Sequence, residues 1–428
     1  MSLSVCGTSA LAVFCIGLNA AAAMLCVHPG AKNACFSSIQ AAVDAAAPGD
    51  TVKVGPGIYR ESVTISKSLS LIADGSVIID ATSLANGIRV DGSGASLTGV
   101  AVKGFTVKNA NFEGILVLNA TDITLAYNSV RHNDLSLNIN DATCPGLPTW
   151  ETAEGEDCGE GIHLVGVVSS IVAHNFVEGN SGGILLSDET ASTHDNLITE
   201  NTVKDNPFDC GITLAGHPQA VTFGTPLGVF NNVVDGNRAI HNGYQVPGAG
   251  AGVGIFAFIP GANMSGNVVS NNVLLNNGIP GMTIHLHVPG MNFDNTKIVH
   301  NFIRGNGADS DPDAITPGTA GINIGGHSVV NGLIIAKNKI RNEQTDIVIN
   351  LPSSVSLHLN DLLGNGFGVQ NLGTGAVDAT ANWWGCDDGP GNQGCSNVGS
   401  GILYNPWLTA PVNGDEHHGD NDDEDSDR

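Results

Sequence analysis

A four-residue motif, Gly-Ile-x-Leu or a close variant, returns along most of this chain and constrains its fold more than any other feature. Neighbouring copies are 22–28 residues apart, or 40–47 where the same unit carries an inserted loop. Such a repeat predicts stacked coils of short strands, in which added length makes more coils and not more domains. The copies begin at Gly87, Gly114, Gly161, Gly183, Gly211, Gly254, Gly281, Gly321 and, with Asp in place of Gly, Asp346.

A second motif, Asn-x-(Val/Ile)-x-x-Asn, falls between copies of the first, for example at 175–180, 201–206, 232–237, 267–272 and 301–306. Asn is unfavourable inside an ordinary strand, but an inward Asn at the same place in each coil can form a ladder through the stack. Three short strands per coil fit this spacing. The sequence therefore predicts an all-β, single-stranded parallel β-helix of roughly ten coils. A leucine-rich horseshoe and a β-propeller fit the spacing less well.

Both ends of the predicted stack carry segments suited to cover an open coil. Residues 38–45 have helical spacing, and 48–50 end that helix before a strand at 51–54. At the other end, bulky aromatic residues predict a lid over the last coil: Trp383, Trp384, Tyr404 and Trp407.

Residues 39–44, 48–52 and 55–61 resemble the opening of pectin-methylesterase-like proteins, and 382–385 with 405–408 resemble the closing segment of bacterial secreted β-helix repeat proteins. The chain is thus similar to the pectin-lyase-like superfamily. The resemblance implies a right-handed helix and a substrate bound along one sheet face, between walls of inserted loops. The motifs that carry catalysis in pectin methylesterases, polygalacturonases and mannuronan epimerases are absent, so no known catalytic set transfers intact.

The ends of the chain and its cysteines indicate export. We expect a signal peptide at 1–25, the β-helix domain at 26–412 and a disordered acidic tail at 413–428. A membrane anchor is the alternative for the first segment, but its apolar run is shorter than a bilayer span needs. We expect a secreted, periplasmic or cell-surface protein. Three local disulfides are predicted: Cys26–Cys35, Cys144–Cys158 and Cys386–Cys395, leaving Cys210 as a buried thiol.

The formal net charge of −25 excludes nucleic acid as a natural partner. We expect a polysaccharide or glycan that is neutral or weakly charged, no stable membrane insertion and a monomer. Few Lys or Arg residues lie in the middle of the chain, which leaves little for a lyase that uses a basic side chain.

Alternation along each motif places x, and the residue two later, on the outer face of its strand. Phe256 and Phe258 there predict either a platform for sugar stacking or a pair of aromatics covered by the 243–253 loop. Further insertions around 134–160, 215–229, 288–296 and 307–320 supply the predicted walls. The substrate-binding residues predicted on this face are His163, Thr213, Phe256, Phe258, Thr283 and Asn323.

The residues six positions after each motif start form a second column: Glu189, His217, Pro260, His287 and His327. With His285 on the same strand face, His287 and His327 predict a zinc or copper site. Alternatively, His217 or His285 is a catalytic base with Asp209 or Glu189 as its partner. A third interpretation is that these are polar turn residues bonded to backbone. Acidic residues also gather near the starts of coils: Asp188, Asp209, Asp294, Asp311 and Asp313. They are either ligands of a Ca²⁺ site or solvated loop carboxylates.

Three functions remain open from the sequence. The first is a secreted carbohydrate-active protein that binds and cleaves or epimerises a glycan, as a lyase, hydrolase or epimerase. The second is a periplasmic copper- or zinc-handling protein, since some β-helix proteins serve copper delivery. The third is a non-catalytic surface scaffold.

Overall fold

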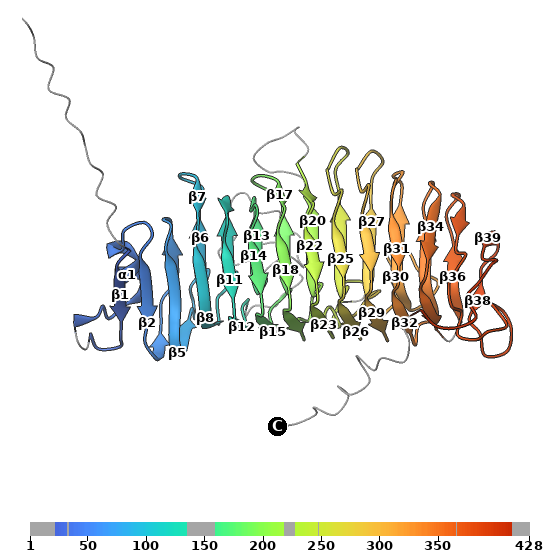
Figure 1. The fold of residues 1–428 in the computed structure, drawn as a ribbon. Helices are drawn as coiled ribbons and strands as arrows, with labels where there is room; N and C mark the ends of the chain where they lie inside the picture. Colours follow the sequence, from blue (N-terminus) through green and yellow to red (C-terminus); the bar gives the residue numbers. More distant parts are fainter. Residues whose placement is uncertain are drawn as a thin grey trace, which may run out of the picture.

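The molecule is one long stack of parallel β-coils, with strands following one another along its axis (Figure 1). The computed structural model describes residues 22–31, 34–134, 159–217, 227–246, 248–364 and 366–412. These residues contain a single helix, α1, and otherwise strands and turns. The predicted parallel β-helix is confirmed. Nearly all of the predicted signal peptide, and all of the predicted acidic tail, lie outside the described residues.

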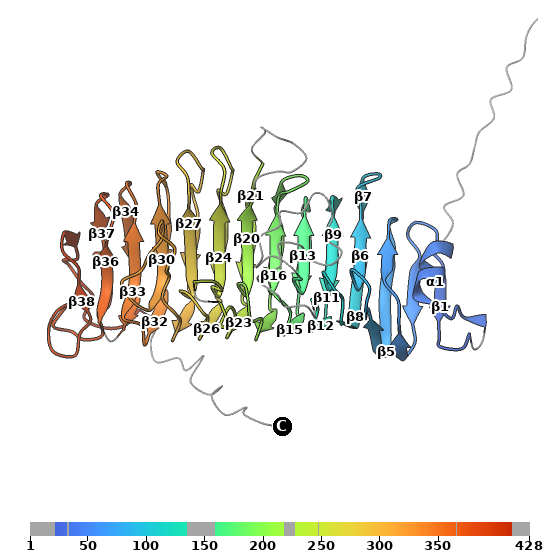
Figure 2. The same ribbon diagram turned by 180° about the vertical axis from the view of Figure 1, so that it is seen from behind.

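The Gly-Ile-x-Leu copies form one sheet, which has 12 strands within the described residues and runs the length of the stack (Figure 2). Ile162 lies opposite Ile184, which lies opposite Ile212, and all three side chains are buried in the core. The motif therefore places its aliphatic residues inward, as predicted. The strands are β4 (Val63–Ile65), β6 (Ile88–Asp91), β9 (Ile115–Leu118), β13 (Ile162–Val165), β16 (Ile184–Ser187), β20 (Ile212–Gly216), β24 (Val253–Ala257), β27 (Met282–Leu286), β30 (Ala320–Gly326), β33 (Thr345–Asn350), β36 (Phe367–Asn371) and β38 (Asn397–Val398).

The start of one Gly-Ile-x-Leu copy, the one at Gly254, was predicted two residues too late. Val253 lies opposite Ile212 and opposite Met282, so the motif in this coil begins at Gly252 and not at Gly254. Gly254 itself occupies the outward x position, where a Cβ would collide with the ring of Phe256. Gly254 thus makes room for a neighbouring aromatic ring, and a sequence pattern alone does not separate that role from the role of a motif glycine.

The glycine that begins each motif is required by the close approach of successive coils. A Cβ on Gly183 would collide with the backbone carbonyl of Gly211 in the next coil, and one on Gly211 would lie 2.9 Å from the carbonyl oxygen of Gly252. The chain therefore repeats glycine at this corner because backbone packs there against backbone.

The remaining strands form two further rows that belong to one 23-stranded sheet of the described residues. Between the rows each coil bends at one residue of left-handed backbone, such as His174 (φ 54°) or Glu200 (φ 53°). The first row contains β11 (Thr124–Ala126), β14 (Ile171–Ala173), β18 (Leu197–Thr199), β22 (Val233–Asp235), β25 (Val268–Ser270), β28 (Lys297–Val299), β31 (Ile334–Ala336), β34 (Val355–His358) and β37 (Val377–Asp378). The second contains β12 (Ser129–Arg131), β15 (Phe176–Glu178), β19 (Thr202–Lys204), β23 (Arg238–Ile240), β26 (Val273–Leu275), β29 (Phe302–Arg304), β32 (Lys339–Arg341) and β35 (Asp361–Leu363).

The other strands lie outside the 12-stranded sheet and the two groups of strands just named. Near the N-terminus, the long strands β5 (Ser70–Asp80) and β8 (Ala101–Lys108) serve both rows at once, because β8 pairs with β11 and with β12. The others are β1 (Met24–Val27), β2 (Thr51–Val54), β3 (Gly57–Tyr59), β7 (Leu97–Thr98), β10 (Ala120–Thr121), β17 (Thr193–His194), β21 (Val229–Phe230) and β39 (Ile402–Leu403).

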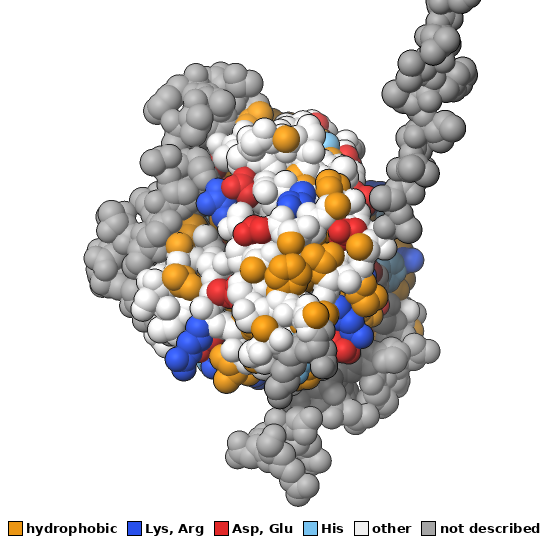
Figure 3. Space-filling view, turned by 90° about the vertical axis from the view of Figure 1, so that its left-hand side faces the viewer, with side chains coloured by type: hydrophobic (Ala, Val, Ile, Leu, Met, Phe, Trp, Pro, Cys, Tyr) orange, Lys and Arg blue, Asp and Glu red, His pale blue; other side chains and the backbone are white. Residues whose placement is uncertain are grey.

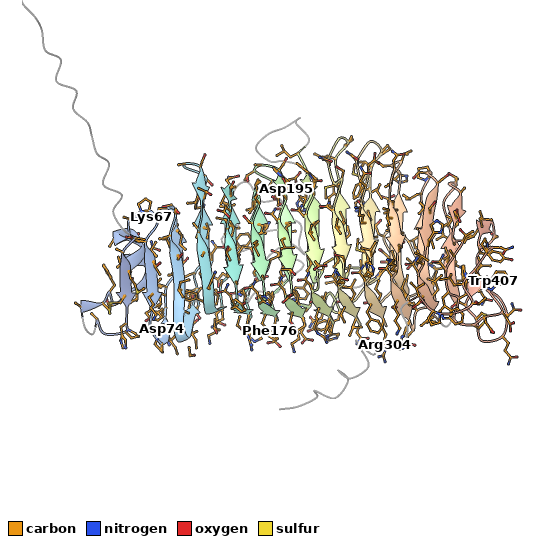
Figure 4. All side chains as sticks on the ribbon, in the orientation of Figure 1. Lys67, Asp74, Phe176, Asp195, Arg304 and Trp407 are labelled. Atoms are coloured by element: carbon orange, nitrogen blue, oxygen red, sulfur yellow. A yellow bond between two sulfur atoms is a disulfide. The ribbon has the colours of Figure 1, made fainter. Side chains whose placement is uncertain are left out.

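Phe176 and Arg304, both on strands of the second row, lie along the same edge of the stack (Figure 4). The guanidinium of Arg131, one coil away, lies 4.6 Å from the centre of the Phe176 ring. Aromatic and basic side chains on this edge therefore cover one another, and the cation–π contact offsets the exposure of the ring.

Buried Asn side chains run through the stack as ladders, as predicted, but in more than one column. In the main column, the side-chain amide of Asn201 donates to Oδ1 of Asn237 at 3.0 Å, and Asn237 donates to Asn272 at 3.0 Å. Asn232 belongs to another column, in which it accepts from Asn196. The uniform five-residue spacing in the sequence hides this difference, because each coil offers several inward corners five residues apart.

The column that begins at Asn133 ends on an acid. Asn306 donates through its backbone N–H and its side-chain amide to Oε1 of Glu343, at 2.9 and 3.2 Å. Glu343 is buried, and burial raises the pKa of its carboxyl to about 7. The neighbouring carboxyl of Asp346 is also buried, and its pKa is raised well above the ordinary value.

We expect Glu343→Gln to stabilise the protein at alkaline pH and to change little at pH 4. The unfolded carboxyl has a pKa of 4.5, so between pH 4.5 and about 7 the folded state holds a proton that the unfolded chain releases. Stability therefore falls as pH rises through this window. At pH 8, the amide introduced by the substitution keeps the acceptor for Asn306 without the charge and should add about 2–3 kcal/mol to the unfolding free energy. Denaturant unfolding at both pH values measures the difference, and an equal effect at both would contradict it.

The N-terminal coil is covered by α1 (Ile39–Ala45), which buries Ile39, Ala42 and Val43. The Ser38 side chain caps this helix by accepting from the backbone of Ala41, and the Glu61 carboxylate accepts from its first two amides. The predicted helix and the strand β2 that follows it are thus present. Seen along the axis from this end, acidic and basic side chains surround a group of hydrophobic ones (Figure 3).

At the C-terminal end Trp384 is fully buried, and Tyr404 and Trp407 pack against the core. Disulfides join Cys26 to Cys35 and Cys386 to Cys395, as expected. The third predicted pair, Cys144–Cys158, lies outside the described residues. Within the described ranges, no helix has the length and apolar character needed to cross a bilayer.

Candidate functional site

A cavity of about 250 Å³ lies over the outer face of β20, β24 and β27. Its walls are residues 248–250 on one side and Asp311 of the 307–319 loop on another. Seven of the residues predicted as catalytic, substrate-binding or metal-binding line it: Asp209, Thr213, His217, Phe256, Phe258, His285 and His287. The structure thus gathers into one cavity residues that are far apart in the sequence.

The two loops meet above the sheet. A Cβ on Gly248 would collide with the hydroxyl of Ser310, and Gly248 has a φ of +89°. Glycine is needed at this position both for its backbone conformation and for the contact between the loops. These insertions therefore act as walls, as the sequence predicted for 243–253 and 307–320.

The column of polar residues after each strand differs from prediction in one member. His217 stacks on Phe258 at 6.1 Å between ring centres, and Phe258 stacks on His287 at 4.5 Å. Phe258 therefore occupies the place assigned to Pro260, because the motif of this coil begins two residues earlier. In the structure the column reads Glu189, His217, Phe258 and His287.

His217 and Glu189 form an ion pair at one end of the cavity, with Nδ1 of the imidazole 3.0 Å from a carboxylate oxygen. Burial raises the pKa of Glu189, but the adjacent His217, together with His163 and Ser187, outweighs burial and lowers this pKa to about 2. Glu189 is thus ionised and places a negative charge beside the imidazole of His217. Asp188 accepts from the backbone N–H of His217 at 2.8 Å, and burial raises the pKa of Asp188 to about 7.

A second histidine–carboxylate pair lies at the other end. Nε2 of His285 is 2.7 Å from Oδ2 of Asp309, whose side chain is fully buried. The same carboxylate oxygen accepts from Thr283 at 3.4 Å and from the side-chain amide of Asn323 at 3.2 Å. Three groups therefore fix Asp309, and Asp309 in turn fixes the ring of His285.

Asp309 was not predicted from the sequence. Its neighbours Asp311 and Asp313 were named as acids near a coil start. Asp309 lies in the same inserted, acid-rich loop, 307–320, and this position was the signal that could have identified it. What sets Asp309 apart is that the loop folds back over β27 and β30, and only the tertiary structure shows this.

His285, His287 and Asp311 each offer a potential metal ligand atom, and these atoms lie within 4.8 Å of one another. Burial, and the neighbouring His285, lower the pKa of the His287 imidazole. His327, the third ligand predicted from the sequence, is not part of this group. Its ring is about half exposed, and its Nε2 bonds to Asp313 at 2.8 Å, so Asp313 lies between it and His287.

The two phenylalanines of the predicted sugar platform are half-buried and already in contact with other rings. Phe258 is stacked between His217 and His287. The edge of Phe256 meets His285 at 4.8 Å between ring centres, and Phe256 also packs against Cys210. They form a ring cluster that shapes the cavity, and not a flat open surface.

The other predicted substrate-binding residues are buried, contrary to the prediction that they face solvent. His163, Thr283 and Asn323 are 0% exposed and Thr213 is 4% exposed. The reason is that the x positions lie beneath a polar layer of loop residues. Thr213, for example, donates to Asp209 at 3.1 Å, as Thr283 does to Asp309. Of these four, only Thr213 lines the cavity.

His163 belongs to a second group of potential ligands, with Glu113 and Glu160, and all three are fully buried. Both nitrogens of His163 are engaged, Nδ1 with Glu113 at 2.9 Å and Nε2 with Ser187 at 2.7 Å. Burial raises the pKa of Glu113. This group is therefore a fully buried polar network.

The remaining acids do not form a common cation site among the described residues. Asp209 holds Thr213, Asp188 holds the backbone of His217, and Asp294 accepts from Asn331. None of the three belongs to a group of ligand atoms within 4.8 Å. Cys210 is a free thiol in the cavity lining, and burial raises its pKa well above the ordinary value, so it stays protonated.

The sequence family described as a right handed beta helix region matches residues 82–298, about half of the chain. The chain belongs to the right-handed β-helix family. The fold expected from the pectin-lyase-like resemblance is thus confirmed in its handedness as well as in its parallel coils. This membership defines the architecture of the candidate site and does not name its chemistry.

Among solved structures, the chain is similar to DFA-IIIase from Arthrobacter chlorophenolicus A6, solved without its lid in complex with GF2. The TM-score is 0.52 at 14% identity, over 82% of this chain and 88% of that one, which shows a common fold. The GH87 alpha-1,3-glucanase of Streptomyces thermodiastaticus strain HF3-3 gives a TM-score of 0.45 at 16% identity, over 86% and 65% of the two chains.

A cell surface glycoprotein of Methanothermus fervidus is 31% identical over 99 residues. The match covers 23% of this chain and 16% of the glycoprotein, so the chain spans only a small part of that relative.

Proposed function

We propose that the chain is an exported enzyme that acts on a glycan at the cavity over β20, β24 and β27. The observation that carries the proposal is that two histidine–carboxylate pairs, His217–Glu189 and His285–Asp309, face one cavity from different ends. Cleavage or epimerisation of a sugar needs one group to take a proton and another to give one, and paired histidines supply both. The two disulfides support export.

His217 is the group that we assign as the principal acid–base. The ionised Glu189 beside it fixes the imidazole and stabilises the proton that His217 gains. Asp188 holds the backbone of His217 in place. Asp209, which the sequence offered as the alternative partner, bonds to Thr213 and lines another part of the cavity.

The size and charge of the cavity favour one unit of a neutral or weakly charged glycan. Its volume of about 250 Å³ is below the roughly 300–1,000 Å³ of sites that enclose drug-sized ligands, which suits a single sugar ring. Among the residues that the structure describes, its lining includes Asp209 and Asp311 but no Lys or Arg. A polyanionic substrate would therefore meet unfavourable charge there.

A screen of neutral and weakly charged polysaccharides tests the proposal. Reducing ends report hydrolysis, unsaturated products report elimination, and proton NMR reports epimerisation. We expect one product class with the parent protein and none with the double variant His217→Ala/His285→Ala. Folding of the variant is checked by its thermal unfolding. Absence of binding and conversion across the panel, or unchanged conversion by the double variant, would overturn the proposal.

A further inference from the structure

We propose that His285, His287 and Asp311 bind one divalent transition-metal ion, of which Zn²⁺ is the best match. The inference rests on the proposed function in one respect, because it assigns the ion to the same cavity. It differs from the metal site predicted from the sequence, since Asp311 of the loop wall takes the place of His327.

The ligand set has the chemistry and the spacing that zinc requires. Two imidazoles and a carboxylate are a common donor set for catalytic zinc. In tetrahedral coordination, ligand atoms about 2.0–2.1 Å from the ion lie about 3.3–3.5 Å from one another. Nδ1 of His287 is 3.8 Å from Oδ2 of Asp311, and the three ligand atoms lie within 4.8 Å of one another. Small side-chain movements would bring these atoms to tetrahedral spacing, and Asp311 is on a loop.

The surroundings of His285 provide the outer support typical of a metal ligand. Its Nε2 is bound by the buried carboxylate of Asp309, which leaves Nδ1 as the nitrogen for the ion. Histidines that bind metals usually contact a carboxylate through their other nitrogen in this way, which fixes the tautomer and the ring. Thr283 and Asn323 hold Asp309 from the strands beneath.

The second group of potential ligands in the described residues lacks this arrangement. Both nitrogens of His163 are engaged, by Glu113 and by Ser187, so neither remains for an ion. That group is fully buried, whereas His285, His287 and Asp311 line the cavity. An ion held by these three would keep its fourth position open toward a bound sugar.

Within the proposed enzyme, an ion held by His285, His287 and Asp311 would supply Lewis-acid polarisation of a substrate oxygen, and His217 would exchange the proton. His285 would then hold the ion, and the ion would take over the role that the proposed function gives to the His285–Asp309 pair. The acidic side chains around the cavity are compatible with a cation there. Nδ1 of His287 also bonds to Oδ2 of Asp313 at 3.4 Å, a contact that the ion would replace.

Calorimetric titration of the metal-free full-length chain with Zn²⁺, and Co²⁺ absorption spectra, test the site without reference to activity. We expect one equivalent of Zn²⁺ to bind and Co²⁺ to give the visible bands of four-coordination. His285→Ala, His287→Ala and Asp311→Asn should each weaken binding by more than a hundred-fold. Asp309→Asn, which removes only the outer support, should weaken it by about 10–100-fold.

His327→Ala is the matched control, because His327 is close by but bonds to Asp313. Its affinity for Zn²⁺ should equal that of the parent. The same titration in a His417→Ala/His418→Ala background excludes binding by the tail. Unchanged binding in Asp311→Asn, or an equal loss in His327→Ala, would overturn the proposal. Asp311→Asn is a mild loop change, so its result stands even if a histidine variant unfolds. Zinc binding with no conversion of any glycan would reject the proposed function and keep the site.

Discussion

Replacement of His217 by Ala is expected to lower kcat/KM on the glycan substrate by about 100- to 10,000-fold, the range for loss of a general acid–base. The physical reason is that the fully buried, ionised Glu189 forms its ion pair with His217, and His217 is the member of this pair that lines the cavity. Glu189→Gln keeps the shape of the pair but removes its charge, so it should lower kcat more than it raises KM. Steady-state kinetics on the substrate identified by the screen measure both.

His194→Ala is the control for this prediction. His194 also pairs with a carboxylate, Asp195 at 2.8 Å, and stacks on Phe230, but it lies outside the cavity lining. Its activity should match that of the parent. Added imidazole should restore part of the activity of His217→Ala, because a small base can enter the space that the side chain leaves. A folded His217→Ala variant with parental activity would remove His217 from the mechanism.

Replacement of Asn237 by Ala is expected to lower the unfolding free energy by about 3 kcal/mol. Oδ1 of Asn237 accepts from the backbone and side-chain amides of Asn201, both at 3.0 Å. Its own amide donates to Asn272 at 3.0 Å and to the carbonyl of Ile198 at 2.8 Å. The substitution leaves the backbone N–H of Asn201 and the carbonyl of Ile198 buried without these partners, which is the costly case for a hydrogen bond.

Denaturant unfolding of this variant is compared with Asn397→Ala. Asn397 is also on a strand, β38, but its side chain is exposed, so its replacement should change stability by less than about 0.5 kcal/mol. If the two variants were equally stable, the ladder would not contribute to stability in the way that its hydrogen bonds imply.

The stack was predictable because both of its repeats follow from physics that acts at every coil. Aliphatic residues such as Ile184 and Ile212 recur where a parallel strand must bury one side chain, and glycine recurs where Gly183 meets Gly211. The helix 39–45 was predictable for a similar reason, since its cap, Ser38, and its apolar spacing are local. Even so, the motif in one coil was predicted to begin at Gly254, two residues too late, because Gly254 is a glycine with a different role.

The candidate site was predictable only as a set of residues. The sequence placed His217, His285 and His287 on one outer face, and the structure places all three in one cavity. It offered Glu189 and His217 as a pair, which the structure brings together, with Asp209 as another possible partner. It did not show that Thr283 and Asn323 are buried supports.

What the sequence by itself determined is the repeating part of this protein: the parallel coils, their inward aliphatic and Asn positions, and the face that carries the histidines. What only the tertiary structure decided is how the inserted loops lie on that face. It brought Asp309 and Asp311 to His285 and His287 and left His327 with Asp313. The reason is that a coil is specified by its own residues and its neighbours, whereas an inserted loop has no period and its position depends on contacts with several coils at once.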